Sequence, residues 1–460
     1  MAHPTSNDSP SESVLLPIRR SRVDPLLRPV HAFLSVESAG GVVLLVSAVV
    51  ALVWANSPWG DTYAAFWHTK VSFSAGPYGH AMSLEHWVND GLMVVFFLLV
   101  GLEIKRELLL GELASVRQAT LPVAAALGGM IVPALIYAGI NHGGAGAAGW
   151  GVPMATDIAF AVGVLALVGR RVPTSVKVFL LAIAIVDDLG AIVVIAVFYT
   201  SQVSLGALGV AGVFGVGLVM LNVLRVHRPL PYILLGLGLW AATLASGVHA
   251  TIAGVLLAFT IPASRQIEEQ PYVAYIRNML SRFERDSTAM PDKITHSQSH
   301  AIKAMEEASQ AVQTPLARVE HALLRPTNFL IVPLFALANA GVDVRSGVGP
   351  AVNSPVMWGV LGGLLVGKPV GILLASWLAI RSGLGAMPLG ASRLQIIGVG
   401  ALCGIGFTMS LFVANLAFPG DTATLSAAKV GILVASILSG VLGGALIAMS
   451  GRRTVGQDQE

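Results

Sequence analysis

Long apolar stretches recur along almost the whole chain, and they limit the folds that it can adopt. A membrane-spanning helix needs about 20 consecutive apolar residues, and stretches of this kind follow one another from 36 to 449. Hydrophobic residues make up 55% of the sequence and charged residues only 12%, a composition typical of membrane proteins. The sequence therefore predicts an all-α polytopic membrane protein.

The apolar stretches divide into twelve candidate transmembrane helices. They are 36–56, 87–109, 119–140, 151–169, 174–200, 204–223, 230–247, 248–262, 326–342, 355–380, 394–418 and 424–449. Segment 33–262 then contains helices 1–8, and segment 326–450 contains helices 9–12. The single cysteine, Cys403, excludes a disulfide bond within the chain.

Lys and Arg are distributed unequally between the loops on the two sides. With a cytoplasmic N-terminus, nearly all of them fall in inside segments, and only Lys70, Arg345 and Lys429 fall outside. This is the bias that the positive-inside rule describes. We therefore expect two cytoplasmic tails, a disordered one at 1–32 and one at 451–460. The basic residues form no cluster, so we expect no nucleic-acid partner.

Two loops are long enough to form structure outside the membrane. Segment 57–86, on the outer side, has strand-forming residues after Lys70 followed by turn residues, which predicts a small hairpin. The cytoplasmic segment 263–325 places Tyr272, Ile276 and Phe283 at helical spacing. Two interpretations stay open for it: an interfacial amphipathic helix, or a partly ordered, solvated linker.

Asp187 and Asp188 lie side by side near the middle of the predicted helix 174–200. Ionisable residues at membrane depth are costly and usually functional. Neighbours on a helix point about 100° apart, so one carboxylate can line a cavity while the other meets a partner helix. Burial and mutual repulsion favour protonation, and oxygen ligands suit hard cations. The pair can therefore exchange protons for a cation; a purely structural buried pair is the alternative.

Thr156 and Asp157 follow Pro153 within the predicted helix 151–169. Proline interrupts a helix and frees backbone carbonyls, which membrane proteins tolerate only where protein or a water-lined cavity satisfies the backbone. A broken helix that carries a hydroxyl and a carboxylate predicts an ion site. The alternative is a kinked helix in which Asp157 is a buried N-cap.

Lys368 is the only basic residue deep within a predicted helix. An unpaired ammonium group is costly in that position, so we expect an ion pair with one of the aspartates at similar depth. The alternative is a side chain that snorkels to the membrane interface.

A second interruption, at Gly404–Gly406, lies in the predicted helix 394–418. Segments 119–200 and 355–449 are both three-helix units with an interrupted middle helix, and they begin on opposite sides. This pattern predicts the inverted repeats of secondary transporters, with the site where the interrupted helices cross. We expect Asp157 to offset the positive half-helix ends there and Lys368 the negative ends.

Seven motifs, in order over roughly 30–450, together resemble those of the NhaA-type bacterial sodium/proton antiporters. They are GLEIKRE (101–107), ATDIAF (155–160), IVDDLG (185–190), SGVHAT (246–251), PLFALANAG (333–341), GKP (367–369) and GIGFTMS (404–410). The resemblance implies an electrogenic antiporter of the bacterial inner membrane that expels Na+ or Li+ in exchange for a larger number of incoming H+. It also implies a homodimer through 57–86 and no cofactor.

The resemblance further implies roles for single residues. Asp188 would be the main ligand of the transported Na+, with Asp157 and Thr156 in the same site. Asp187 would pair with Lys368 in the proton-loaded state. The pH-sensing candidates would be Glu103, Arg106, Glu107, His249, Glu320 and His321. An exposed charge cluster at a helix end is the alternative for the first three.

The sequence departs from the family pattern before Pro326. The preceding loop is long, and Leu324-Arg325 stands where the family has a second histidine. We therefore expect the set point or the steepness of pH activation to differ.

Three other classes can be separated by specific features. An intramembrane aspartyl protease needs an aspartate after its Gly-x-Gly turn, where this chain has Phe407. A sodium-coupled symporter would carry an organic solute inward, whereas Asp187, Asp188 and Lys368 favour proton exchange. A passive channel would show no coupling to pH.

Overall fold

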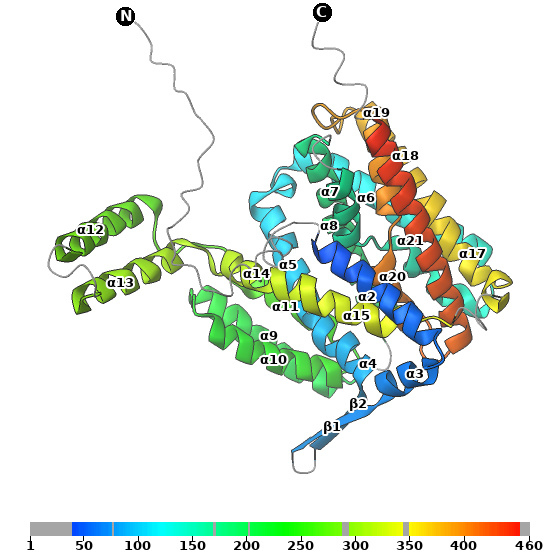
Figure 1. The fold of residues 1–460 in the computed structure, drawn as a ribbon, viewed down its shortest axis with the longest axis horizontal. Helices are drawn as coiled ribbons and strands as arrows, with labels where there is room; N and C mark the ends of the chain where they lie inside the picture. Colours follow the sequence, from blue (N-terminus) through cyan, green and yellow to red (C-terminus); the bar gives the residue numbers. More distant parts are fainter. Residues whose placement is uncertain are drawn as a thin grey trace, which may run out of the picture.

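The computed structural model describes residues 39–75, 78–168, 172–200, 203–287, 294–343 and 349–450. The two predicted tails, 1–32 and 451–460, lie outside these ranges. Within them the chain is helical apart from one two-stranded hairpin and short connections. Figure 1 shows a bundle in which the first described helix, α2, and the last, α21, cross the same face.

Eight helices of the described ranges are long and apolar enough to cross a membrane, and ten spans result if each of two bent pairs counts as one. The single spans are Leu84–Leu110, Val116–Ile140, Thr174–Phe198, Leu205–Val223, Pro315–Asn339, Pro355–Arg381, Arg393–Ala417 and Thr422–Ser450. Two shorter apolar helices, α10 (Pro229–Ala245) and α11 (Thr251–Thr260), occupy the remaining predicted stretches. The total of twelve transmembrane helices stays a prediction.

The first part of the chain forms one face of the bundle. Helix α2 (Ala39–Ala55) is followed by α3 (Gly60–His68) at an angle of 113°. Strands β1 (Lys70–Ala75) and β2 (Tyr78–Ser83) then pair antiparallel, with Lys70 opposite Ser83. The hairpin extends away from the helices (Figure 1). We refer to the side of the bundle that carries it as the hairpin side.

The next span begins at the hairpin. It comprises α4 (Leu84–His86), a π-helical turn η1 (Trp87–Leu92) and α5 (Met93–Leu110), and a short turn η2 (Glu112–Ala114) follows. Because α5 starts on the hairpin side, Glu103 and Arg106 lie toward the opposite side.

Two three-helix units, each with a broken middle span, form the centre of the molecule. The first contains α6 (Val116–Ile140), the pair η3 (Ala145–Met154) and α7 (Ile158–Val168), and α8 (Thr174–Phe198). The second contains α17 (Pro355–Gly362), η6 (Gly363–Gly367) and α18 (Lys368–Arg381), the pair α19 (Arg393–Cys403) and α20 (Phe407–Ala417), and α21 (Thr422–Ser450). Both breaks fall at the interruptions expected from the sequence. The inverted relation between the units stays a prediction.

Helices α6 and α18 approach each other closely enough to fix the depth of Lys368. A side chain at Gly128 of α6 would collide with the backbone of Gly371 on α18, and the reverse holds as well. Small residues allow this approach between helices in membranes. Lys368 is one turn from Gly371, so the close contact holds its side chain at the centre of the bundle.

The remaining helices lie to one side. Helix α9 (Leu205–Val223) packs on α10, and α11 packs on α5. Lys105 of α5 donates hydrogen bonds to the carbonyl oxygens of Phe259 and Ile261 at the end of α11, the first at 2.7 Å. Asn222 of α9 donates to the carbonyl of Thr260. These side chains satisfy the last carbonyls of α11, which have no partner within the helix.

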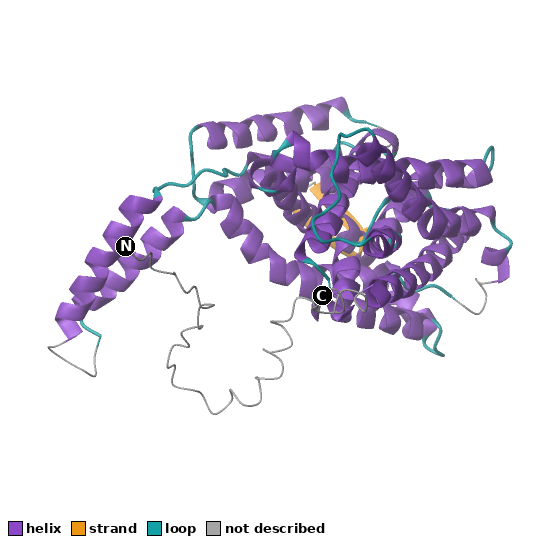
Figure 2. Cartoon of the chain, turned by 90° about the horizontal axis from the view of Figure 1, so that it is seen from above, coloured by secondary structure: helices purple, strands orange, loops and turns teal. Residues whose placement is uncertain are grey.

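Segment 263–325 contains a helical hairpin that projects from the bundle (Figures 1 and 2). Its helices are α12 (Glu269–Ser287) and α13 (His296–Val312). Part of the apolar face of α12 packs against α13, since Tyr272 contacts Ser309 at 3.1 Å and Met279 is buried, whereas Leu280 is exposed. A second helix therefore covers part of the amphipathic face, and the two interpretations left open by the sequence stay predictions.

Helix α14 (Pro315–Pro326) begins before the expected start of the ninth span at 326 and continues through η5 (Thr327–Ile331) into α15 (Val332–Asn339). The reason is local. Thr314 accepts a hydrogen bond from the Ala317 N–H at 3.1 Å, and Pro315 occupies the first helical position, where a missing N–H costs nothing. The helix therefore starts at the Thr-Pro pair rather than at the first long apolar run.

Candidate functional site

The two interrupted spans cross where their helices break. The chain between η3 and α7 is extended at 155–157, and the chain between α19 and α20 is non-helical at 404–406. The backbone N–H of Asp157 donates to the carbonyl of Ile405 at 2.7 Å, which joins the two breaks directly. Four helix ends therefore meet at the crossing, two with free N–H groups and two with free carbonyls.

Asp157 binds both positive helix ends. Its Oδ1 accepts a hydrogen bond from the N–H of Phe160, in the first turn of α7, at 2.9 Å. Its Oδ2 accepts from the N–H of Thr408, at the start of α20, at 3.0 Å and from the Thr408 hydroxyl at 2.6 Å. A carboxylate is favourable at a helix N-terminus, and here one carboxylate serves two helices.

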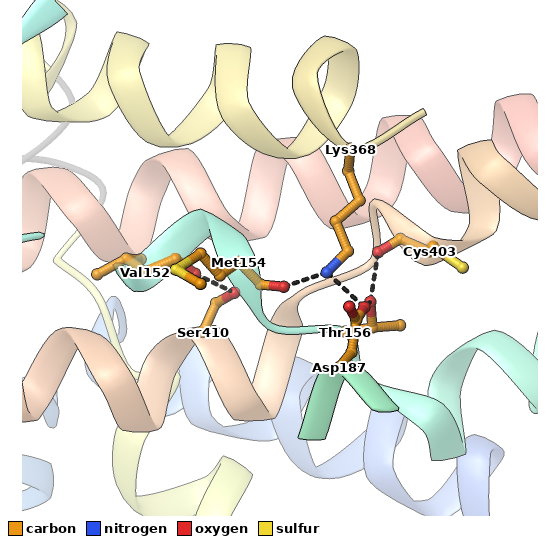
Figure 3. A network of polar contacts seen from close by, with 7 residues as sticks. All are labelled: Val152, Met154, Thr156, Asp187, Lys368, Cys403 and Ser410. Carbon is orange, nitrogen blue, oxygen red and sulfur yellow. Dashed lines mark hydrogen bonds and ion pairs between the residues drawn. The ribbon is translucent and has the colours of Figure 1, made fainter. Parts of the chain in front are cut away.

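Lys368 occupies the opposite, negative side of the crossing (Figure 3). Its ammonium group donates to the carbonyl of Met154 at the end of η3 and lies 2.6 Å from Asp187 Oδ2. Both side chains of this ion pair are completely buried. A buried pair of this kind is strongly destabilised if one partner is removed, because the other charge is left uncompensated.

Thr156 connects the ion pair to the second broken span. Its hydroxyl lies 2.8 Å from Asp187 Oδ2 and 2.9 Å from the carbonyl of Cys403 at the end of α19. A hydroxyl has one proton, so Thr156 can donate to only one of these acceptors at a time. Ser410 makes a similar link by donating to the carbonyl of Val152 at 2.8 Å (Figure 3).

Asp188 differs from its neighbour. It is also buried, with 1% of its surface exposed, but its Oδ1 has no hydrogen-bond partner among the described residues, and no ion pair joins Asp188 to another group there. The roughly 100° between adjacent helical residues turns it away from Lys368. A buried carboxylate without a donor is costly, so Asp188 requires either a proton or a cation.

A cavity of about 170 Å³ adjoins Asp188. Its polar lining comprises Asp188, Asp157, Thr408, Glu103 and Asn328, and the rest is mainly apolar, including Phe96 and Leu324. Thr156 is not among the lining residues, because it lies on the Lys368 side of the crossing. Glu103 and Leu324 place this cavity between the crossing and the side of the bundle opposite the hairpin.

The predicted pH-sensing residues fall in two places. Arg106 lies 2.6 Å from Glu320 and 3.6 Å from Glu107, and Glu103 of the same helix lines the cavity. His321 is exposed on α14 beside Glu320.

His249 lies apart from them, at the hairpin side. Its Nε2 is 2.6 Å from the carbonyl of Tyr199, and because a carbonyl only accepts, this nitrogen carries the proton. The structure therefore joins α5 to α14 through charges and leaves His249 on the opposite side.

Comparison with known proteins decides the family. A model of the family described as Na+/H+ antiporter 1 matches residues 31–447. The chain belongs to this antiporter family. It is 49% identical to a Na(+)/H(+) antiporter NhaA of Oleidesulfovibrio alaskensis over 91% of this chain and 93% of that one.

Other relatives agree. An NhaA antiporter of Koribacter versatilis is 48% identical, over 92% of both chains, and one of Bordetella parapertussis is 48% identical over 94% of this chain and 98% of its own. The prediction of an all-α polytopic membrane protein of the NhaA-type family is confirmed. The names of the relatives are those of transporters and not of enzymes.

Thr408 is the main residue of the crossing that the sequence did not single out. It makes two of the three hydrogen bonds to Asp157. Its position two residues after Gly406, at the start of a half-helix, was the available signal. The backbone acceptors of Met154 and Cys403 carry no side-chain signal, because any residue there would present the same carbonyl.

Proposed function

We propose that this chain is an electrogenic antiporter that expels Na+ or Li+ from the bacterial cytoplasm across the inner membrane in exchange for a larger number of H+. The main support for this proposal is the environment of Asp188. It is buried and unpaired among the described residues, it adjoins a cavity, and it lies next to a second aspartate whose charge Lys368 already balances. A carboxylate in this situation binds a proton and a cation alternately.

The proposed site separates the tasks of the three aspartates. Asp157 is engaged by three hydrogen bonds, so it holds the helix ends and leaves one acceptor position on Oδ1 for a cation. Asp188 supplies the main ligand oxygen. Thr156 is available only if it turns from Asp187 or the Cys403 carbonyl, and we assign it a secondary role.

The proton-loaded state contains the Lys368–Asp187 ion pair and a protonated Asp188. Arrival of a cation at Asp188 displaces its proton and draws the Asp187 carboxylate away from Lys368. The ammonium group of Lys368, left without its counter-ion, then releases the second proton. Return of protons restores the pair and expels the cation. A larger number of H+ than of Na+ moves net positive charge inward, so the membrane potential drives export.

Alternating access requires that the crossing be reached from one side at a time. The cavity beside Asp188 extends toward Glu103 and Leu324, so this conformation is the inward-facing one if the termini are cytoplasmic. The Arg106–Glu320 ion pair, which joins α5 to α14 at that entrance, is our candidate for pH regulation, together with Glu103, Glu107 and His321. We further propose a homodimer that forms through segment 57–86.

A vesicle assay tests this function. In everted membrane vesicles with an imposed pH gradient, added Na+ should collapse that gradient, which a pH-sensitive dye reports. Li+ is tested in parallel, and both cations are tested between about pH 6.5 and pH 8.5. An antiporter responds to Na+ alone, a symporter needs an organic solute, and a channel shows no pH coupling. No response to either cation at any pH would reject the proposal.

A further inference from the structure

Three asparagines from three separate spans form a hydrogen-bonded cluster outside the site described above. Asn339 at the end of α15 donates to Asn89 Oδ1 in η1 at 2.8 Å and to the carbonyl of Phe335 at 2.9 Å. Its own Oδ1 accepts from the amides of Asn415 on α20 at 2.6 Å and Asn89 at 3.3 Å. Asn339 is completely buried and is the hub of this asparagine triad.

The same three spans also line the cavity beside Asp188. Glu103 of α5, Val332 of α15 and Thr408 of α20 contribute to its wall. At 1.5 Å per residue, Asn339 and Asn415 lie roughly 10 Å farther along their helices than these residues, and Asn89 lies roughly 20 Å away along its own. In all three spans the displacement is toward the hairpin side, so the triad lies between the site and that side.

A layer of aromatic rings separates the triad from the cavity. Phe335 of α15 and Phe412 of α20 lie between the cavity residues and the asparagines of their helices, and Phe97 of α5 lies next to Phe96, the lining residue of that helix closest to Asn89. The ring of Phe412 is 5.3 Å from that of Phe97 and 6.2 Å from that of Phe335, measured between centroids. All three are essentially inaccessible, and an apolar constriction of this kind excludes water and ions.

Beyond the triad the molecule is hollow again. A cavity of about 520 Å³ opens on the hairpin side, and Ala338 and Gly341, on either side of Asn339 in sequence, form part of its wall. Its ionisable lining residues are Asp61, Glu85, Asp343, Lys429 and His68. Lys429, near the outer end of the predicted helix 424–449, lies about two turns into α21, which begins at Thr422 after the Asp421 cap, and its side chain reaches the cavity.

We propose that Asn89, Asn339 and Asn415 form the gate that closes the transport path on the hairpin side. The inference rests on the proposed antiport function. When the triad is hydrogen-bonded, the spans that contain α5, α15 and α20 are held together and the three aromatic rings stay packed in one layer. The site beside Asp188 is then accessible only from the side opposite the hairpin. The π-helical turn that carries Asn89 is a type of irregularity often found at functional positions.

The gate has a closed and an open state because its buried amide groups need hydrogen-bond partners in each. Buried amides are stable while they bond one another. Once the spans separate, the same groups are satisfied by water from the 520 Å³ cavity, and a half-open arrangement would leave them unsatisfied. In the open state, the amide oxygens and the water bound to them are also available to a cation that passes the aromatic layer.

Asn339→Ala tests the gate, because it removes the hub without touching the crossing. Loss of the three hydrogen bonds that Asn339 shares with Asn89 and Asn415 should shift the equilibrium toward the state open to the hairpin side by roughly tenfold or more. The half-saturating Na+ concentration should then rise in everted vesicles, where Na+ meets the cytoplasmic side, and fall in right-side-out vesicles. A shift in the same direction on both sides, or on neither, would overturn the proposal.

Asn222→Ala is the matched control, since Asn222 also joins two helices but lies on α9, away from the path. Its half-saturating concentrations should not change. If Asn339→Ala fails to fold, the milder Asn415→Ser replaces it. We expect the same opposed changes in the half-saturating Na+ concentration, but smaller ones.

A labelling experiment separates failure of the gate from failure of the transport function. In a Cys403→Ala background, Asn415→Cys should react with a membrane-impermeant maleimide in right-side-out vesicles, and added Asn339→Ala should accelerate the reaction several-fold. This readout needs no transport. An unchanged rate overturns the gate even if Na+/H+ exchange is intact, whereas an accelerated rate supports the gate even if exchange is absent.

Discussion

Asp188 differs from the other two aspartates of the crossing in having no partner for its charge among the described residues, while Asp157 caps two helices and Asp187 faces Lys368. We expect Asp188→Asn to reduce Na+-driven proton movement to the level of vesicles that lack the protein, because an amide cannot exchange a proton for a cation. Expression and melting temperature should be unchanged. The everted-vesicle assay and thermal melting measure both quantities.

Asp421→Asn is the control for this substitution. Asp421 is exposed and caps α21 through the Thr424 N–H at 3.0 Å, and asparagine caps a helix equally well. It should transport Na+ normally. Full activity of Asp188→Asn would remove Asp188 from the site.

Lys368→Ala should lower stability by about 3–5 kcal/mol, the usual effect of breaking a buried ion pair from one side. The loss should depend on pH. Asp187, left alone, can escape its uncompensated charge by taking up a proton, which is easier at low pH, so the destabilisation should be smaller near pH 6 than near pH 8. Thermal melting across this range measures it, with the exposed Lys303→Ala as control. Equal destabilisation at both pH values would contradict the ion pair.

One carboxylate, that of Asp157, joins the N-terminal ends of the half-helices α7 and α20. Thr408→Val removes the hydroxyl that donates to Asp157 Oδ2 and leaves the backbone N–H in place. A hydrogen bond to a charged group contributes about 1.5–3 kcal/mol, so the melting temperature should fall, and transport should fall with it because the ends of α7 and α20 are less fixed. Thr408→Ser keeps the hydroxyl and should behave nearly like the parent chain. If valine and serine behaved alike, the hydroxyl would not hold the crossing.

Sequence reasoning reached the helix breaks and the isolated lysine because both signals are local. Pro153, Gly404 and Gly406 mark the breaks, and Lys368 stands out in an apolar run. Composition and spacing did not decide which aspartate faces Lys368, since that depends on the rotation of α8 within the bundle; Asp187 followed only from the family resemblance. The asparagine triad joins residues up to 326 positions apart along the chain, from Asn89 to Asn415, so no local sequence pattern indicates it. The contact between α12 and α13 likewise has no local sequence signal.

For the whole molecule, the α12–α13 hairpin is the part least connected to the rest. The N–H of Gln266 donates to the carbonyl of Ala311 at 3.1 Å, so the two ends of the hairpin already lie together at its base. Replacement of 267–310 by a short glycine linker should therefore leave folding and Na+/H+ exchange intact, with a change in melting temperature of only a few degrees. Everted vesicles and thermal melting provide the test.

The outcome also shows what the hairpin does. Exchange with an altered pH profile would assign it to regulation, through its direct continuation into α14 and Glu320. Complete loss of exchange in a well-folded protein would contradict the independence of the hairpin.

In the proposed mechanism, a cation and protons compete for the same buried carboxylates. The most direct measurement is calorimetric titration of the purified protein with Na+ in two buffers of different ionisation enthalpy, which gives the number of protons released for each cation bound. This competition predicts that more than one proton is released, that the affinity for Na+ weakens as the pH falls, and that Asp188→Asn shows no binding. Na+ binding that is independent of pH and releases no proton would contradict it.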